Sequence, residues 1–208
     1  MMLTIWGRTN SINVQKVMWT VAELGLQHER IDVGRQFGGL DTPEFLAMNP
    51  NGRIPTIVDD DGTVVWESNA VVRYLAAKYG AGSLWPDDAA RRASADQWMD
   101  WMLTVIAPLI NPVFVALIRT APEERDSDAL AAAAEGLADA WRILDAHLAA
   151  QPYAVGEALS MADIPIGCAC FRYYALDLAH PDLPNVAAWY ARLQERESFR
   201  EHVMIALS

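Results

Sequence analysis

Glu67 and Ser68, followed by Asn69, precede the stretch from Ala70 to Leu75, whose spacing predicts a helix. Amides at a helix N-terminus bind anions, including carboxylates, and a glutamate can pair with an ammonium group. Together these groups suit the zwitterionic end of an amino acid. The alternative is that Ser68 only caps the helix and Glu67 only interacts with its dipole. Spacing alone favours that simpler interpretation.

Ile54-Pro55 precedes a predicted β-hairpin. Two β-branched runs, residues 56–58 and 63–66, flank Asp61-Gly62, a dipeptide typical of hairpin turns because glycine accepts positive φ. Proline belongs at the first residue of a strand or at an edge, since it cannot donate to the ladder. A cis Ile54–Pro55 bond, which is uncommon, would turn the Ile54 backbone outward to pair with an extended ligand.

Two motifs lie at one spacing in residues 49–75: N-P-x-G-x-[IV]-P and W-E-S-x-A-[IV]-x-x-Y-L. This combination resembles the glutathione-binding half of the glutathione S-transferase superfamily. The resemblance implies that Pro55 is cis and that the Ile54 backbone pairs with the cysteinyl part of glutathione. It also implies that Glu67 and Ser68 hold the γ-glutamyl end.

Such an enzyme must form a thiolate near neutral pH, although a free thiol has a pKa of about 8.5. The resemblance implies donors in the turn after the first strand, where Asn10, Ser11 and Asn13 stand. The family has branches that use Tyr, Ser, Cys or Asn, and this chain has no Tyr before Tyr74 and no Cys before Cys168. This leaves Ser11 or an Asn. The run S-I-N-V-Q-K-V from Ser11 resembles bacterial and fungal branches in which a Thr or Ser and an Asn two residues later share the sulfur, which implies Ser11 as the first candidate and Asn13 as the second, with Asn10 close behind. Alternatively, one of them merely caps the first helix.

Two loops offer further contacts to glutathione. Gln36 and Phe37, beside Arg35, follow the second predicted strand, and Arg53 lies in the loop before the hairpin. A basic group in either loop could reach the glycyl carboxylate, although simple solvation of these surface residues is the favoured alternative.

The chain divides into two regions by pattern. Residues 1–80 predict the order β-α-β-α-β-β-α, an α/β arrangement that matches the thioredoxin-like domain implied by the resemblance. Residues 81–88 form a linker rich in Gly and Pro, and residues 89–208 predict an all-helical domain. Pro108 and Pro112 interrupt its first long helix and predict a kink or break, because each removes a backbone donor. The alternative is that the helix simply ends there and restarts.

Side chains of the helical domain could line the pocket for a second substrate. Trp98, Trp101 and Met102 follow one face of the first long helix, and Arg119 ends it. The alternative for this aromatic stripe is a place in the core. Near Ser160, the sequence S-M-A-D predicts a capping box at the start of a later helix.

Composition excludes several classes of partner. The 208 residues carry a formal net charge of −11, which argues against nucleic acid and anionic membrane surfaces. We expect no membrane span, because no run of about 18 apolar residues is evident, and no signal peptide is visible at the N-terminus. Cys168 and Cys170 make neither a disulfide framework nor a metal-type pattern, so we expect a cytoplasmic protein without a metal.

The resemblance therefore implies a glutathione S-transferase of a bacterial Ser/Asn-type branch. It would use glutathione as co-substrate, direct it at a small electrophile in detoxification, and form a homodimer as the family commonly does. One alternative is a glutathione-dependent peroxidase or disulfide reductase that uses the same site. The other is a non-catalytic scaffold with this fold.

Overall fold

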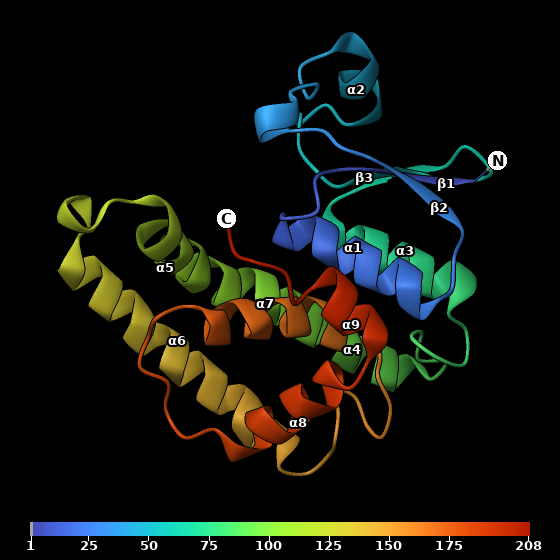
Figure 1. Ribbon diagram of the computed structural model, residues 1–208. Coiled ribbons are helices and arrows are strands. Elements are labelled where there is room, and N and C mark those ends of the chain that lie inside the picture. Colours follow the sequence, from blue (N-terminus) through green and yellow to red (C-terminus); the bar gives the residue numbers. More distant parts are fainter. Residues whose placement is uncertain (1) are drawn as a thin grey trace.

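The computed structural model describes residues 2–208 as an α/β layer followed by a layer of helices (Figure 1). The first layer comprises β1 (Leu3–Trp6), α1 (Ile12–Glu23), β2 (His28–Ile31), the 3₁₀ turn η1 (Arg35–Phe37), α2 (Pro43–Met48), β3 (Thr56–Val58), β4 (Val64–Trp66) and α3 (Ser68–Tyr79). The predicted order of strands and helices is confirmed.

The second layer is helical throughout. It comprises α4 (Ala89–Trp101), the π-helical segment η2 (Met102–Ile106), α5 (Ala107–Arg119), the 3₁₀ turn η3 (Pro122–Glu124), α6 (Ser127–Leu148), α7 (Asp163–Ala175), α8 (Pro184–Gln194) and α9 (Glu197–His202). The predicted α/β plus all-α fold is therefore confirmed.

The sheet is mixed, with strand order β2-β1-β3-β4. β1 runs parallel to β2 and antiparallel to β3, and β4 returns antiparallel to β3. α1 and α3 lie on one face of the sheet, whereas α2 lies beyond the other (Figure 1). Leu3 and Ile5 alternate into a core with Val17, Ile57 and Leu75, as the two-residue period of a strand requires. This core fixes α1 and α3 side by side.

Pro108 and Pro112 do not break the long helix, so the alternative of a helix that ends and restarts is wrong. The helical run continues from Ala89 to Arg119, but it widens into the π-helical segment η2 just before Pro108. A proline removes one helical donor and crowds the carbonyl four residues back. A π-bulge is one of the recognised ways in which a helix absorbs such a defect.

The expectation that the sequence contains no run apolar enough to span a membrane is wrong. The helix Ala89–Arg119 is long and apolar enough to do so by length and composition alone, and 28% of its most apolar window is buried. In the fold, its α5 part packs against α6 and α7. Its remaining apolar side chains include Leu103, Val115 and Ile118, which are exposed.

α7 begins where the sequence predicts a capping box. The buried Asp163 carboxylate accepts hydrogen bonds from the Ser160 amide at 2.9 Å and the Ser160 hydroxyl at 3.1 Å. It also accepts from the Ala154 amide and from Trp189 Nε1, each at 2.9 Å. Asp163 therefore joins the start of α7 to the preceding loop and to α8, a structural role.

α1 is the element that joins the two layers. Its Trp19 is fully buried and meets the ring of Phe199 edge-on at a centroid distance of 4.7 Å. Gly167 of α7 lies against Trp19 so closely that a Cβ there would come within 2.8 Å of the indole. At the end of α1, Glu23 accepts from Arg196 Nε at 2.7 Å. These contacts anchor α1, whose other end carries Ser11 and Asn13.

Candidate active site

The N-terminal ends of α1 and α3 meet through a side-chain contact. The Ser68 hydroxyl donates to Asn13 Oδ1 at 3.2 Å, although 55 residues separate the two. Ser68 is the first residue of α3, where Glu67 holds the N-cap position, and its hydroxyl bonds to the side chains of Asn13 and Lys16 rather than to an α3 amide. The simpler interpretation of Ser68 as a cap is therefore wrong. Two helix N-termini, each with free first-turn amides, converge on one place.

Ser11 and Asn10 lie in the turn that enters α1. Ser11 is the N-cap residue by position, but its hydroxyl makes no capping bond. Its main-chain oxygen accepts from Val14 N and Gln15 N, both at 2.9 Å. Asn10 Nδ2 donates to Ser208 Oγ at 2.6 Å, and Asn10 Oδ1 is buried without a partner among residues 2–208. The Ser11 side chain therefore stays free for a ligand.

Glu67 holds an unusual backbone conformation. Its φ is 69° and its ψ is 115° at the N-cap of α3. A residue with a Cβ at positive φ costs on the order of 1–3 kcal/mol, and such outliers cluster at functional sites. The side chain makes no capping bond and is exposed, so its carboxylate is available to a ligand beside the α3 amides.

The Ile54–Pro55 bond is cis, as the resemblance implies. Ile54 packs beside the end of β1, because a Cβ built on Gly7 would lie 3.4 Å from Ile54 Cβ. Pro55 is buried and Ile54 half-buried. The loop that holds Ile54 thus adjoins the turn that leads to Ser11.

The remaining predicted contacts are exposed. Gln36 and Phe37 lie in η1, where Phe37 is 48% exposed. The Arg53 side chain is also exposed, while its carbonyl accepts from Asn49 Nδ2 at 2.8 Å. No hydrogen bond within residues 2–208 joins the Gln36 or Arg53 side chains to Asn13 or Ser68.

Lys16 is the residue of this site that the sequence interpretation missed. It is fully buried, and its Nζ donates to Ser68 Oγ and Asn69 Oδ1, each at 3.3 Å. No carboxylate lies within ion-pairing distance of it in the described chain. Burial lowers the pKa of Lys16 to about 8. No local sequence signal predicts the burial of Lys16, because that burial arises only when α3 and α7 pack against α1.

The aromatic stripe of α4 belongs mainly to the interior. Trp98 packs on Trp101 at a centroid distance of 5.1 Å and on His147 at 4.5 Å, and Trp101 faces Trp141 at 6.4 Å. Met102 is buried, and its sulfur accepts from Lys16 at 3.8 Å. Cores use tryptophan in this way, so the core alternative holds for Trp98 and Trp101.

The two cysteines are also interior. Cys168 and Cys170 are fully buried on α7. Burial raises the pKa of Cys168 to about 12 and that of Cys170 well above its ordinary value. Because the thiolate is the reactive form, neither side chain provides a nucleophile for this site.

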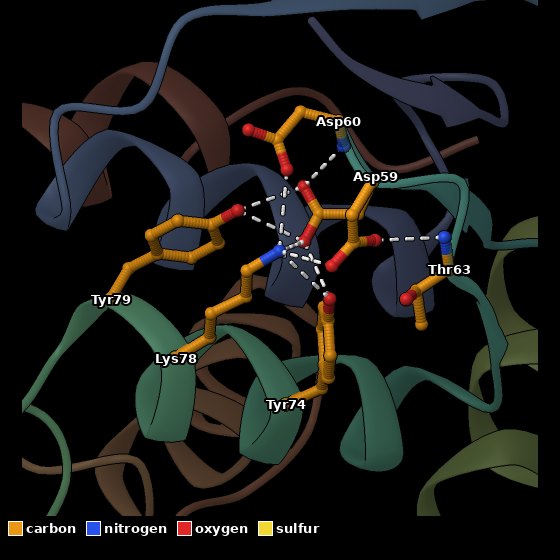
Figure 2. Close-up of polar contacts among 7 residues, drawn as sticks. Asp59, Asp60, Thr63, Tyr74, Lys78 and Tyr79 are labelled. Carbon is orange, nitrogen blue, oxygen red and sulfur yellow. Dashed lines mark hydrogen bonds and ion pairs between the residues drawn. The ribbon is translucent and has the colours of Figure 1, made fainter. Parts of the chain in front are cut away.

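A second polar cluster lies away from the site, between the hairpin and α3 (Figure 2). Asp59 accepts from the hydroxyls of Tyr74 at 2.6 Å and Tyr79 at 2.9 Å, and Lys78 Nζ lies 2.8 Å from it. Lys78 also pairs with Asp60 and Asp61, the other carboxylates close enough to hold a metal. The Lys78 ammonium already supplies a positive charge to the three carboxylates, so this cluster fixes the hairpin on α3.

Comparison with known proteins places both layers in one family. Residues 10–78 match the model "Glutathione S-transferase, N-terminal domain", and residues 102–197 match "Glutathione S-transferase, C-terminal domain". The chain is 43% identical to glutathione S-transferase GstB of Escherichia coli strain K12 over 208 residues, the whole of both chains. It is 32% identical to glutathione S-transferase 3 of Zea mays, covering 97% of this chain and 93% of that protein.

A solved structure agrees with these matches. The theta class glutathione S-transferase of Xanthomonas axonopodis pv. citri, crystallised with glutathione bound, superposes with a TM-score of 0.94. It is 44% identical to this chain, and the match covers all of both.

Proposed function

This chain belongs to the glutathione S-transferase family, and from that premise we propose that Ser11 and Asn13 stabilise the glutathione thiolate at the N-terminus of α1. The activity is that of a glutathione transferase. The glutathione thiol loses its proton, the sulfur attacks an electrophilic carbon, and a leaving group departs from that carbon with the bonding electrons. The observation that carries the residue assignment is the hydrogen bond from Ser68 to Asn13.

That hydrogen bond decides which atom Asn13 offers to a ligand. Because Asn13 Oδ1 accepts from Ser68, its Nδ2 faces away as a free donor on an exposed side chain. The Ser11 hydroxyl is likewise uncommitted to capping. Asn10 Nδ2 is already used by Ser208. Ser11 and Asn13 therefore rank before Asn10 as thiolate donors.

The proposed glutathione contacts surround these donors. The Ile54 main chain would pair with the cysteinyl part beside cis-Pro55. Glu67 would bind the γ-glutamyl ammonium, and the first amides of α3, with Ser68, its carboxylate. Arg53, Gln36 and Phe37 would meet the glycyl end from the exposed loops.

The proposed thiolate needs a modest stabilisation to form at neutral pH. Lowering the thiol pKa from about 8.5 by one to two units needs about 1.4 kcal/mol per unit. Hydrogen bonds from neutral donors together with a helix N-terminus reach that range. The buried Lys16 ammonium, linked to Asn13 through Ser68, adds positive potential at the same place.

The deciding experiment is an ultraviolet difference spectrum of bound glutathione as a function of pH. We expect a thiolate band near neutral pH that shifts to higher pH in Ser11→Ala and Asn13→Ala. Thr9→Ala is the matched control, because Thr9 is an exposed hydroxyl in the same turn. Unchanged bands in both variants would contradict the residue assignment.

The same spectrum separates the alternatives. Thiolate formation with turnover of hydroperoxides or mixed disulfides, but not of alkyl or aryl halides, would indicate a peroxidase or reductase. In that case the redox thiol is that of glutathione, because Cys168 and Cys170 are buried. Binding without a thiolate band would indicate a scaffold.

The proposal includes a homodimer in the cytoplasm. Apolar side chains remain exposed on β4, at Val64 and Trp66, and on α5, at Val115 and Ile118. A groove of about 530 Å³ lies between α5 and α6. Exposed apolar side chains and an apolar groove of this kind are typical of association sites. Light scattering in solution should give twice the chain mass of 23.0 kDa, and a monomer would contradict the proposal.

A further inference from the structure

Four arginines gather beside the site without an acidic side chain as partner. Arg8 follows β1, Arg35 begins η1, Arg119 ends α5 and Arg172 lies in α7. None of the four forms an ion pair with an acidic side chain in the described part of the chain. The lack of acidic side-chain partners is notable because the whole chain has a net charge of −11. We call these four residues the arginine cluster.

Arg172 is the most unusual member. It is only 6% exposed, and its Nε is buried with no hydrogen-bond partner among residues 2–208. Burial, together with the neighbouring Arg119, lowers the pKa of Arg172 to about 10. A buried charge is costly unless it is paired. The cation does lie over the Phe114 ring at 4.0 Å, but an aromatic face replaces only part of an anion.

Arg119 extends the arginine cluster towards the thiolate donors. Its guanidinium lies over the same Phe114 ring at 4.5 Å, so one ring carries two cations. Arg119 Nη2 also donates to the Ser208 main-chain oxygen at 3.0 Å, while Asn10 Nδ2 donates to Ser208 Oγ. The segment after α9 rises between α5 and the start of α1 (Figure 1). Ser208 thus accepts hydrogen bonds both from α5 and from the turn before Ser11.

Arg8 contributes to the arginine cluster from the α/β layer. Its Nε is buried and has no partner within residues 2–208. A Cβ built on Gly34 would lie 3.2 Å from Arg8 Nη1, which places Arg8 against the start of η1, where Arg35 follows. Burial first, and then repulsion from Arg35 and Arg119, lowers the pKa of Arg8. Like charges held together in this way favour an anion between them.

We infer that the arginine cluster binds an anionic group, such as a carboxylate, on the electrophilic substrate. This inference rests on the proposed function and names the substrate class for the same site. Glutathione itself does not account for the whole cluster. Its proposed contacts lie in residues 10–68, whereas Arg119 and Arg172 belong to α5 and α7 of the helical layer. A guanidinium fork matches a carboxylate geometrically.

Iodoacetate and iodoacetamide provide a matched pair of probes. They share the reacting carbon and the leaving group, and differ in a carboxylate against a neutral amide. In each reaction a bond forms between the glutathione sulfur and the methylene carbon, and the carbon–iodine bond breaks with release of iodide. The buried Cys168 and Cys170 should not consume either reagent.

The measurement is kcat/KM for each probe, divided by the rate constant of its uncatalysed reaction with glutathione. We expect this enhancement to be at least tenfold larger for iodoacetate. Arg119→Met and Arg172→Met should each lower kcat/KM for iodoacetate by about 10- to 100-fold, the range for loss of a charged hydrogen bond. They should leave the iodoacetamide value and the KM for glutathione within threefold.

Arg142→Met is the control, because it removes the same charge from an exposed position of α6. Calorimetry gives a readout without turnover: S-carboxymethylglutathione should bind the wild type more tightly than its carboxamide analogue, and Arg119→Met should abolish the difference. Arg119 is exposed, so this variant should fold even if Arg172→Met does not.

Equal enhancement of both probes, or equal loss of both in Arg119→Met, would overturn this inference and leave the transferase assignment intact. A rise in the KM for glutathione alone would assign the arginines to the glycyl carboxylate instead. Absence of a thiolate band and of enhancement with either probe would contradict the proposed function, and this inference with it.

Discussion

The Ser68 hydroxyl donates to Asn13 Oδ1 across 55 positions of sequence, at 3.2 Å. The same hydroxyl accepts from the buried Lys16 Nζ at 3.3 Å. A relay of three side chains therefore runs from the inside of α1 to the proposed sulfur position. It fixes the side-chain amide of Asn13 so that its N–H groups face outward.

Removal of the Ser68 hydroxyl should impair thiolate formation. In Ser68→Ala, Asn13 loses the contact that orients it, so we expect the pH midpoint of glutathione ionisation to rise by about half to one unit. At pH 6.5, kcat/KM should fall about three- to tenfold. A pH series of initial rates measures both. An unchanged midpoint with a raised KM for glutathione would assign Ser68 to binding alone.

Lys16 should give the stability of the protein an unusual pH dependence. Its pKa in the fold is about 8, below the ordinary 10.5, because the fold buries its charge. Between these values the unfolded chain binds more protons, so Lys16 makes wild-type stability rise with pH, by roughly 1.4 kcal/mol per unit. Below pH 8 the cost of the buried charge is fully present.

Denaturant unfolding of wild type and Lys16→Met tests this dependence. The variant should be the more stable protein at pH 7, and its advantage should shrink from pH 8 to 10.5. The charged groups that face Lys16 are Arg172 and Glu67, with the Cys168 thiol nearby. Lys78→Met is the control: its contacts with Asp59 and Asp61 raise the Lys78 pKa, so its difference from wild type should stay constant over that window.

Asp59 should be the critical carboxylate of the cluster in Figure 2. Its side chain is 1% exposed and accepts from Lys78, Tyr74 and Tyr79. Asp59→Asn should lower the free energy of unfolding by about 2–3 kcal/mol, because it removes charged hydrogen bonds inside the fold. Asp60→Asn is the matched control, since the Asp60 side chain is 53% exposed, and should change stability little.

The contribution of Asp59 should also depend on pH. Burial raises its pKa, but the hydrogen bonds from Lys78, Tyr74, the Asp60 amide and Tyr79 outweigh that effect and lower it. Its stabilisation is therefore complete above the ordinary carboxyl pKa of about 4 and is lost as the pH falls through the lowered value. Wild type and Asp59→Asn should converge in stability in strong acid. A gap that is independent of pH would contradict this account.

Gly167 should tolerate no side chain. A Cβ there would lie 2.8 Å from Trp19 and 2.9 Å from Leu193, both fully buried. Gly167→Ala should destabilise the protein by about 1–3 kcal/mol through overpacking. Gly136→Ala is the comparison: this glycine is also inside a helix, but its new Cβ meets the tip of Leu109 at 3.1 Å. There the higher helix propensity of alanine should offset the contact. Equal effects at both positions in thermal unfolding would contradict the packing argument.

Local chemistry explains why much of the fold was predictable. The hairpin over residues 56–66, the helix that begins at Ser68 and the capping contact of Asp163 all arise from residues within a few positions of each other. The π-helical segment in the long helix also has a local cause, the two prolines. The prolines were visible in the sequence, but their spacing did not show that the helix would widen rather than break where α6 and α7 pack beside it.

The sequence by itself determined the order of the elements, because turns, caps and periodicity act over short distances. Its resemblance to the family supplied the proposed glutathione contacts. The exposure of the Asn13 side chain, its link to Ser68 and the burial of Lys16 were decided only when α1 packed between α3 and α7. The arginine cluster is the extreme case. Arg8, Arg35, Arg119 and Arg172 come from four segments, and no periodic signal in a chain records which side chains of distant segments will face one another.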